Sequence, residues 1–303
     1  MGSLFNLVIY NQDSIGAARA AAHVYRLIDT LNEIYSDYLP QSELNRLCSE
    51  SGNGEWIKVS EPLFHILKTA YYASKWSKGS FDVTSGPLVR LWRRARMEKT
   101  MPDKDSLSAA RKRVGFRLME LDTTNRTIRL KKPGMQLDLG GIAKGETAQK
   151  VYNRLRELGF PHSLLDAGGD IVTGSVPPGI AGWHVAINLP ESEELMKYQL
   201  LLTNKAVTTS GDLYQYMEFK GKRYSHIINP LSGYAITNSR NVTVISGHGI
   251  EADWLTKACS ILPVREALLL IKKFPGTEVQ IAVLKSGKPI YYRSAGFRSY
   301  LME

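Results

Sequence analysis

The chain has 303 residues, of which 43% are hydrophobic and 22% are charged. These proportions are those of an ordinary globular protein, so they exclude an intrinsically disordered or a fibrous chain. The two cysteines exclude a disulfide framework and a cysteine-only zinc site. No apolar run approaches the roughly 18 residues that a transmembrane helix needs. The first residues also lack the pattern of a signal peptide.

Apolar periodicity predicts several helices along the chain. The first begins at Asp13 or Ser14, either of which provides an N-cap. The second begins at Ser60, and Gly79 is placed to end it. Further helices are predicted over residues 143–158, 251–261 and 263–274.

Short apolar or alternating segments predict strands between these helices. Two pairs of strands flank turn sequences and are predicted to be hairpins, one around Gly221 and one around Gly287. The elements follow no regular βαβ rhythm, so we expect an α+β fold of one domain, residues 1–303, with two interlocked lobes. The predicted strands are residues 4–10, 127–130, 135–139, 163–165, 171–172, 183–188, 214–219, 223–228, 242–246, 278–284 and 289–293.

Positive charge is concentrated in one stretch of the chain. The formal net charge is +10, and the segment from Arg90 to Arg117 holds ten Lys or Arg residues against three Asp or Glu. Such a run attracts polyanions, although the solvated surface of a helix has the same pattern. It lacks aromatic residues between Trp92 and Phe116 and any recognised reading motif, so we expect no nucleic-acid partner. A remaining hypothesis is that the run guides an acidic protein or an anionic membrane.

A glycine pair separates a predicted strand from a predicted helix. Asp138 is followed by Gly140 and Gly141, and Lys144 stands in the first turn of the helix. Free N–H groups at a helix start and a nearby ammonium group favour a phosphate, although a plain tight turn has the same sequence. The segment matches neither the P-loop nor the dinucleotide-binding pattern.

Residues 166–170 and 208–212 are weaker candidates for a site. The first segment, Asp-Ala-Gly-Gly-Asp, is equally typical of a turn with Asx hydrogen bonds. The second is rich in hydroxyl groups and is expected to precede a strand. Its Ser210 has no neighbouring base in the sequence, and the G-x-S-x-G pattern of a nucleophile elbow is absent.

His226 and Asp253 are the candidates for chemistry. His226 follows a predicted strand and precedes a Pro and Gly turn, which suits a general base, although a structural histidine fits as well. Asp253 and Thr256 are three residues apart, so a helix places their oxygens on one face near its first turn. Such a pair suits Mg²⁺, which takes few protein ligands, although an N-terminal cap has the same sequence.

Eight blocks in a fixed order span nearly the whole chain: residues 1–5, 36–45, 81–92, 138–145, 168–170, 209–212, 226–233 and 252–258. Together they resemble the ApbE family, the FAD:protein FMN transferases. The resemblance implies a T-fold-like α+β domain of helices and mixed, mostly antiparallel sheet. It also implies a Mg²⁺-dependent enzyme that transfers FMN from its substrate FAD to a Thr or Ser hydroxyl of an acceptor flavoprotein. A phosphoester bond forms in this reaction, and AMP is released.

The resemblance assigns roles to individual residues. His226 is the base that takes the proton of the acceptor hydroxyl. The divalent ion falls on Asp253, Thr256 and the backbone carbonyl of Gly141. The chain departs from the family at the third and fourth positions after the metal-binding aspartate. Some members carry Asp-Thr there, whereas this chain has Thr256 and Lys257. Lys257 is expected to face either the phosphates or solvent. The FAD contacts fall on Met1, Tyr38, Ser80, Phe81, Asp82, Asp138, Lys144 and Ile227.

The resemblance further implies an exported enzyme, periplasmic and associated with the inner membrane. Its acceptors are expected among subunits of membrane redox complexes of the sodium-pumping quinone reductase or a related type. Family members usually carry an export signal, whereas residues 1–3 already match the start of the family core. We therefore expect either a trimmed leader, with membrane contact through the absent N-terminal anchor, or a cytoplasmic relative.

Two other activities fit the same residues. A metal-dependent FAD pyrophosphatase uses water in place of the acceptor hydroxyl and releases FMN and AMP. A non-catalytic FAD-binding protein holds the dinucleotide without releasing AMP. No residue in the sequence decides among the three.

Overall fold

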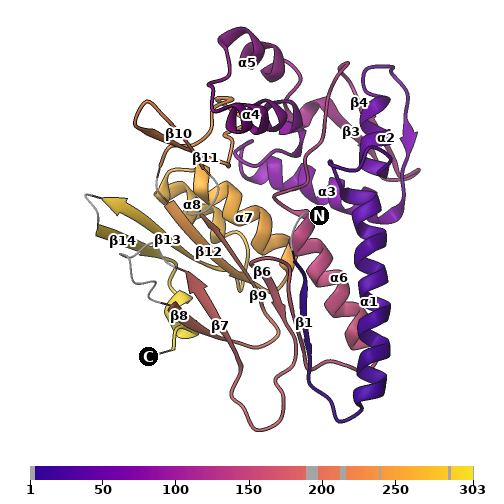
Figure 1. Ribbon diagram of the computed structural model, residues 1–303, viewed down its shortest axis with the longest axis vertical. Coiled ribbons are helices and arrows are strands. Elements are labelled where there is room, and N and C mark those ends of the chain that lie inside the picture. Colours follow the sequence, from indigo (N-terminus) through magenta and orange to yellow (C-terminus); the bar gives the residue numbers. More distant parts are fainter. Residues whose placement is uncertain (1–3, 189–196, 212–215, 239, 286–287, 303) are drawn as a thin grey trace. The chain divides into compact units, whose positions relative to one another are not determined.

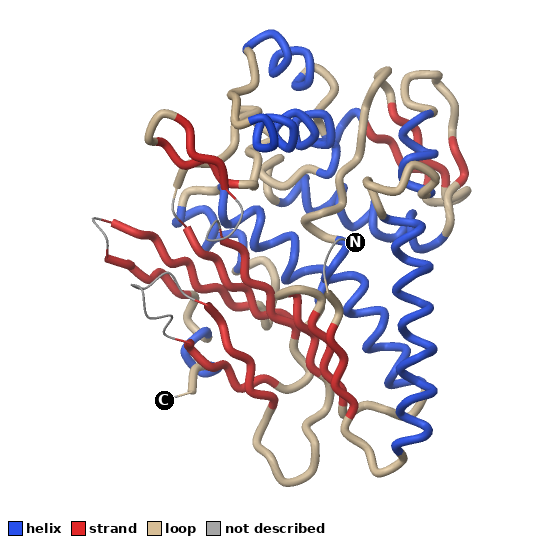
Figure 2. Tube along the Cα trace, in the orientation of Figure 1, coloured by secondary structure: helices blue, strands red, loops and turns tan. Residues whose placement is uncertain are grey.

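The computed structural model describes residues 4–188, 197–211, 216–238, 240–285 and 288–302 (Figures 1 and 2). These residues fall into two compact units, each assembled from segments that are distant in the sequence. Unit 1 comprises residues 1–31, 142–211 and 239–303, and unit 2 comprises residues 32–141 and 212–238. Met1, one of the predicted FAD contacts, lies outside the described residues.

Unit 1 is built on an antiparallel sheet with the strand order β1-β5-β6-β9-β12-β13-β14 (Figure 1). The buried positions of β12 run without a break from Asn241 to Ser246, so both faces of the sheet are covered. The strands are β1 (Asn6–Ile9), β5 (Ser163–Asp166), β6 (Asp170–Thr173), β9 (Ala206–Gly211), β12 (Arg240–Ser246), β13 (Glu278–Lys285) and β14 (Lys288–Arg293).

Helices and a separate hairpin cover the sheet of unit 1. Helices α6 (Ala143–Glu157) and α7 (Gly249–Ile261) pack on its central strands and on each other, and α8 (Val264–Ile271) packs on α7 and β13. A hairpin supplies a second layer against the sheet. Val207 of β9 and Ile245 of β12 are paired across the two strands, and both pack with apolar residues of the hairpin β7 (Trp183–Asn188) and β8 (Lys197–Leu202). A short 3-10 helix, η3 (Phe297–Tyr300), adds Phe297 to this second layer.

Unit 2 is mainly helical. Its core joins α4 (Gly86–Glu98) and α5 (Lys104–Arg111) to the hairpin β10 (Tyr216–Phe219) and β11 (Lys222–Ser225), around the fully buried Trp92. The hairpin turn at Lys220 and Gly221 has positive φ at both residues, as the twist of a two-residue hairpin requires. The other elements are α2 (Glu43–Ser49), α3 (Glu61–Trp76), η1 (Val83–Ser85), η2 (Phe116–Leu118) and the sheet β2 (Ile57–Lys58), β4 (Thr127–Leu130) and β3 (Met119–Asp122).

Helix α1 (Ser14–Tyr35) begins in unit 1, and its last turn belongs to unit 2. None of the described helices combines the length and the apolar character that crossing a membrane requires.

The α+β fold is confirmed, with antiparallel pairing throughout the described sheets. One predicted strand is wrong, because residues 135–139 have no regular secondary structure and join no ladder among the described residues. The N–H of Leu137 donates to the Cys48 thiol of α2, and the N–H of Asp138 donates to the carbonyl of Val83 in η1, so these backbone groups bond to two helical segments rather than to a strand. A Cβ atom on Gly86 would lie 2.5 Å from the carbonyl oxygen of Gln136, which shows how tightly this segment is packed.

The hydroxyl-rich segment 208–211, which was expected only to precede a strand, is itself part of strand β9. Its hydroxyls bond to neighbouring strands, with Thr209 paired to Thr243 of β12 at 3.0 Å between the two oxygens. Asp212 and the first two residues of the predicted strand 214–219 lie outside the described residues, as does the turn at residues 286–287. The sequence pattern missed helices α2, α4 and α5, and strands β2, β3 and β8.

Candidate active site

In unit 1, two carboxylates and two ammonium groups lie close together. Lys144, in the first turn of α6, forms an ion pair with Asp170, which opens β6. Lys257 and Asp253 are four residues apart on α7, and Lys257 Nζ lies 3.0 Å from Asp253 Oδ1. The Asp253 side chain is completely buried and that of Asp170 is 2% exposed, so both carboxylates depend on protein partners rather than on water.

A contact between bare backbones holds α6 and α7 together at this cluster. A Cβ atom on Gly145 would lie 2.2 Å from the carbonyl oxygen of Gly249, and one on Gly249 would lie 2.3 Å from that of Gly145. Such a close approach requires glycine at both positions. It allows the N–H of Gly145 to donate to Asp253 Oδ2 at 3.1 Å, so the start of α6 helps to fix the carboxylate of α7.

Burial dominates the electrostatics of this cluster. Burial, followed by the charge of Asp170, raises the pKa of Asp253, and the two lysines and the Gly145 N–H only partly offset this. Burial also disfavours the charged form of Lys144, but attraction from Asp170 and Asp253 outweighs it and raises the pKa of Lys144. Lys144 is therefore a firmly charged ammonium group at a helix start, which is suited to an anionic ligand.

Part of this cluster fits a hard cation such as Mg²⁺. Asp253 Oδ1 accepts no hydrogen bond from the described residues, although it is buried. The Thr256 hydroxyl donates to the Asp253 carbonyl oxygen at 2.7 Å and accepts from Lys257 Nζ at 3.1 Å, which leaves one lone pair for another ligand. Among the described residues no group of three or more His, Cys, Asp or Glu side chains is placed to hold a metal. This is compatible with Mg²⁺, which keeps several waters or takes phosphate oxygens. Gly141, which belongs to unit 2, stays a predicted ligand.

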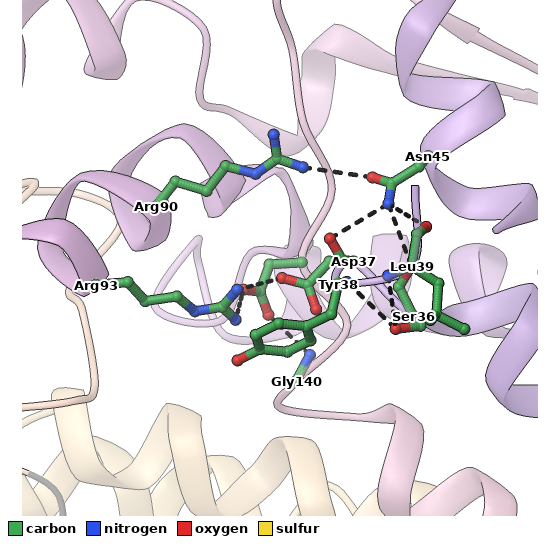
Figure 3. A network of polar contacts seen from close by, with 9 residues as sticks. Ser36, Asp37, Tyr38, Leu39, Asn45, Arg90, Arg93 and Gly140 are labelled. Atoms are coloured by element: carbon green, nitrogen blue, oxygen red, sulfur yellow. Dashed lines mark hydrogen bonds and ion pairs between the residues drawn. The ribbon is translucent and has the colours of Figure 1, made fainter. Parts of the chain in front are cut away.

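In unit 2, Arg93 of α4 links two carboxylates from distant segments (Figure 3). It forms an ion pair with Asp37, and its Nη2 donates to Asp138 Oδ2 at 2.8 Å. Its guanidinium lies 4.5 Å from the centre of the Tyr38 ring, which is 66% exposed. Asp138 Oδ1 accepts the Gly140 N–H at 2.8 Å, so the predicted FAD contacts Tyr38 and Asp138 are held side by side with the glycine turn.

Arg93, which joins the two carboxylates, is not among the site residues that the sequence predicts. Arg93 stands in a run of basic residues where the pattern favours a solvated surface, and its partners are 56 and 45 positions away in the sequence. Arg90 likewise donates to the Asn45 side chain at 3.3 Å, and Arg111 donates to the carbonyl oxygen of Leu231 at 2.8 Å. Part of the basic stretch therefore makes internal contacts of unit 2 rather than forming one continuous free surface.

Replacing Arg93 with methionine should lower the free energy of unfolding by roughly 2 kcal/mol, because two largely buried carboxylates lose the cation that they share. The loss should grow between about pH 4 and pH 7. Burial and the charge of Asp37 already raise the pKa of Asp138, so protonation at low pH removes the repulsion and ionisation at higher pH restores it. Urea unfolding at several pH values measures the effect. Arg94→Met, which removes an exposed arginine of the same helix, should change stability little at any pH.

The predicted segment Ser80, Phe81 and Asp82 is buried in unit 2. Asp82 Oδ1 accepts the N–H and the hydroxyl of Thr84 at 2.8 and 2.7 Å, and its Oδ2 accepts the Phe116 N–H at 2.8 Å. Burial raises the pKa of Asp82 in spite of these bonds. The carboxylate thus caps η1 and ties it to η2, and the contact of this segment with FAD stays a prediction.

His226 directly follows β11 in a firmly anchored turn of unit 2. The Ser225 N–H donates to the Ile236 carbonyl at 2.9 Å, and the Ile236 N–H donates to the Ile227 carbonyl at 2.9 Å. Trp92 Nε1 donates to the Gly233 carbonyl at 2.9 Å and its ring stacks on Tyr224. The His226 side chain is half-buried whereas Ile227 is buried, so the backbone presents the imidazole at the surface of the unit.

The fold and these charged groups define an α+β scaffold that carries buried carboxylates and ammonium groups at converging helix starts. A model of the ApbE family matches residues 1–281, and the chain belongs to the ApbE family.

Curated relatives and solved structures agree with this assignment. A protein of Klebsiella pneumoniae named FAD:protein FMN transferase is 31% identical over 277 residues, covering 88% of this chain and 84% of the relative. One of Treponema pallidum with the same name is 30% identical, covering 92% and 81%. The flavin transferase ApbE of Vibrio cholerae superimposes with a TM-score of 0.90 at 27% identity over 99% of this chain and 96% of that one. A Thermotoga maritima ApbE structure gives 0.88 at 25% identity, covering 100% and 97%.

Proposed function

We propose that this protein transfers FMN from FAD to a Thr or Ser hydroxyl of an acceptor flavoprotein, and that AMP leaves. Two findings support this. The relatives that share its family over most of their length are named FAD:protein FMN transferases. Within unit 1, the observation that carries the proposal is the pairing of a charged Lys144 at a helix start with a buried Asp253 whose Oδ1 accepts no hydrogen bond from the described residues. Such groups suit the diphosphate of a dinucleotide and a cation beside it.

In the proposed reaction the acceptor hydroxyl oxygen attacks the phosphorus on the flavin side of the FAD diphosphate. A phosphoester bond forms, the bond from that phosphorus to the bridging oxygen breaks, and its electron pair leaves with AMP. His226 takes the hydroxyl proton as this bond forms. Lys144 offsets the negative charge on the phosphate oxygens. Asp253 and Thr256 would hold Mg²⁺ within unit 1, and a bound ion would supply additional charge neutralisation. The family resemblance assigns the Gly141 carbonyl as a further ligand.

An assay with and without an acceptor tests the proposal. The protein is mixed with FAD, Mg²⁺ and a flavoprotein subunit of a sodium-pumping quinone reductase, and AMP and covalent flavin are measured. We expect flavin fluorescence on the denatured acceptor band, AMP in equal amount, and loss of both when the acceptor Thr is replaced by Val. Release of FMN and AMP without an acceptor would support the pyrophosphatase instead. FAD binding without AMP would identify a binding protein.

We also propose that the acceptors are subunits of membrane redox complexes and that transfer takes place outside the cytoplasm. The support for this is the family membership of the chain and the protein acceptor implied by the relatives' names. Fractionation of cells that express the native gene tests the location. Recovery of the protein with the cytosol would contradict it.

A further inference from the structure

The ammonium group of Lys257 lies against the carboxylate oxygen that the proposed function gives to a divalent cation. Asp253 Oδ2 accepts the Gly145 N–H, so Oδ1 is the oxygen left for another ligand. Lys257 Nζ stands 3.0 Å from that Oδ1 but without the angles of a hydrogen bond. The interaction is therefore one of charge and proximity, which is also how a metal ion would be attracted.

The charges of this cluster balance without a metal ion. Asp170 and Asp253 supply two negative charges, and Lys144 and Lys257 supply two positive charges. Because both carboxylates are buried, each ammonium lowers the cost of keeping them ionised. A divalent cation at Oδ1 would add two positive charges beside Lys257. Its binding free energy would therefore be less favourable than at a carboxylate without a neighbouring ammonium group.

Lys257 is also tethered and able to move away. It lies one helical turn after Asp253, so its ammonium is held permanently near the carboxylate at a high effective concentration. Its side chain is 18% exposed, and its four-carbon stem has several rotamers. The Thr256 hydroxyl, 3.1 Å from Nζ, is a second partner that the same ammonium already contacts.

We propose that Lys257 is a built-in competitor for the divalent cation: its ammonium occupies the cation position at Asp253 in the metal-free protein, and a metal ion binds there by displacing it. The proposal rests on the ligand role given to Asp253 above. On this proposal the residue at position 257 sets the metal affinity. Lys257 weakens metal binding, and it keeps the metal-free cluster electrically neutral.

Direct metal binding tests the proposal without any turnover. Flavin-free protein is titrated with Mn²⁺, and the free aquo ion is counted by electron paramagnetic resonance. Lys257→Met, which keeps the length of the stem and removes its charge, should bind Mn²⁺ at least about tenfold more tightly than the parent. Lys257→Arg should stay within about twofold of the parent, because the cation remains. The gain should vanish in Lys257→Met combined with Asp253→Asn, which assigns it to that carboxylate.

Lys150→Met is the matched control. Lys150 is also a lysine of a unit 1 helix with an acidic partner four residues away, since its Nζ lies 3.4 Å from Glu146 Oε1 on α6. It should leave the Mn²⁺ affinity unchanged. An equal gain in Lys150→Met would overturn the proposal, because the effect would then be one of overall charge.

The same affinity in Lys257→Met and the parent would also overturn the proposal, as would an absence of binding in both. Circular dichroism melting checks that the variant is folded, and Lys257→Gln carries the same expectation if Lys257→Met does not fold. FMN transfer by the parent at saturating Mg²⁺ is measured separately. Its failure would refute the proposed function, whereas the Mn²⁺ comparison of folded proteins would still decide the role of Lys257.

Discussion

Replacing His226 with alanine should lower the rate of FMN transfer by roughly 10²- to 10⁴-fold, the range that a positioned general base contributes. FAD should still bind, and the free energy of unfolding should change little. The reason lies in the anchoring of the turn: its hydrogen bonds join backbone atoms of Ser225, Ile227 and Ile236, and Trp92 holds its far end at Gly233. These bonds join backbone and Trp92 atoms, so the turn should keep its shape when the imidazole is removed.

Single-turnover transfer, FAD titration and thermal melting of His226→Ala give the three measurements. His184→Ala, which removes an exposed histidine of β7, serves as the control and should transfer FMN at the parental rate. Added imidazole should restore part of the lost rate, since a missing base can be supplied from solution whereas a misfolded turn cannot. Parental activity in His226→Ala would remove this residue from the mechanism.

Replacing Asp253 with asparagine should abolish Mn²⁺ binding at the cluster and lower the rate of FMN transfer by about 10²-fold or more. Loss of a residue that only orients a metal ligand lowers activity by about 10- to 100-fold, and loss of the ligand itself should lower it at least as much. The protein should keep its stability at pH 7 or gain some. Burial and Asp170 raise the pKa of Asp253 in the folded protein. The ionised form therefore opposes folding as the pH rises through that value, and a neutral amide of the same shape escapes this cost.

Loss of activity without loss of stability separates a functional carboxylate from a structural one. The change is followed by Mn²⁺ titration, transfer assay and urea unfolding of the same preparation. Glu266→Gln, on the exposed first turn of the next helix α8, is the control and should match the parent in all three. A large drop in the unfolding free energy of Asp253→Asn would instead show that the carboxylate mainly holds α6 and α7 together.

Local patterns predict well where one residue type has one structural consequence. Helix α6 was expected over residues 143–158 and is observed as Ala143–Glu157, and Gly159 follows it with positive φ. The hairpin around Gly221 was predicted for the same reason, since its turn requires residues that accept positive φ. The segment 135–139, which was predicted to be a strand, shows where local patterns fail. Its apolar spacing is that of a strand, but nothing in the spacing reports that its neighbours are Cys48 and Val83 rather than another strand.

The candidate sites follow the same rule. Lys144 and Asp253 stand out in sequence because helix starts and acidic residues have local signatures, whereas their partners do not. Arg93 joins Asp37 and Asp138 across long stretches of chain, and a run of basic residues conceals which arginine turns inward. The sequence leaves open whether Lys257 faces phosphates or solvent, and it carries no sign of the contact with Asp253, one turn earlier on the same helix, that the structure shows.

The contact between Gly145 and Gly249 limits how mutations, natural or engineered, can alter the charged cluster of unit 1. Lys144 and Asp253 sit on separate helices whose spacing is set by main-chain atoms in contact, with no side chain between them that could be enlarged or trimmed. Substitutions in the surrounding core should therefore change the distance between the two charged groups little. The backbone fixes this distance. The ligand affinity of the cluster can then be altered by substituting residues such as Lys257, which change its charge without moving a helix.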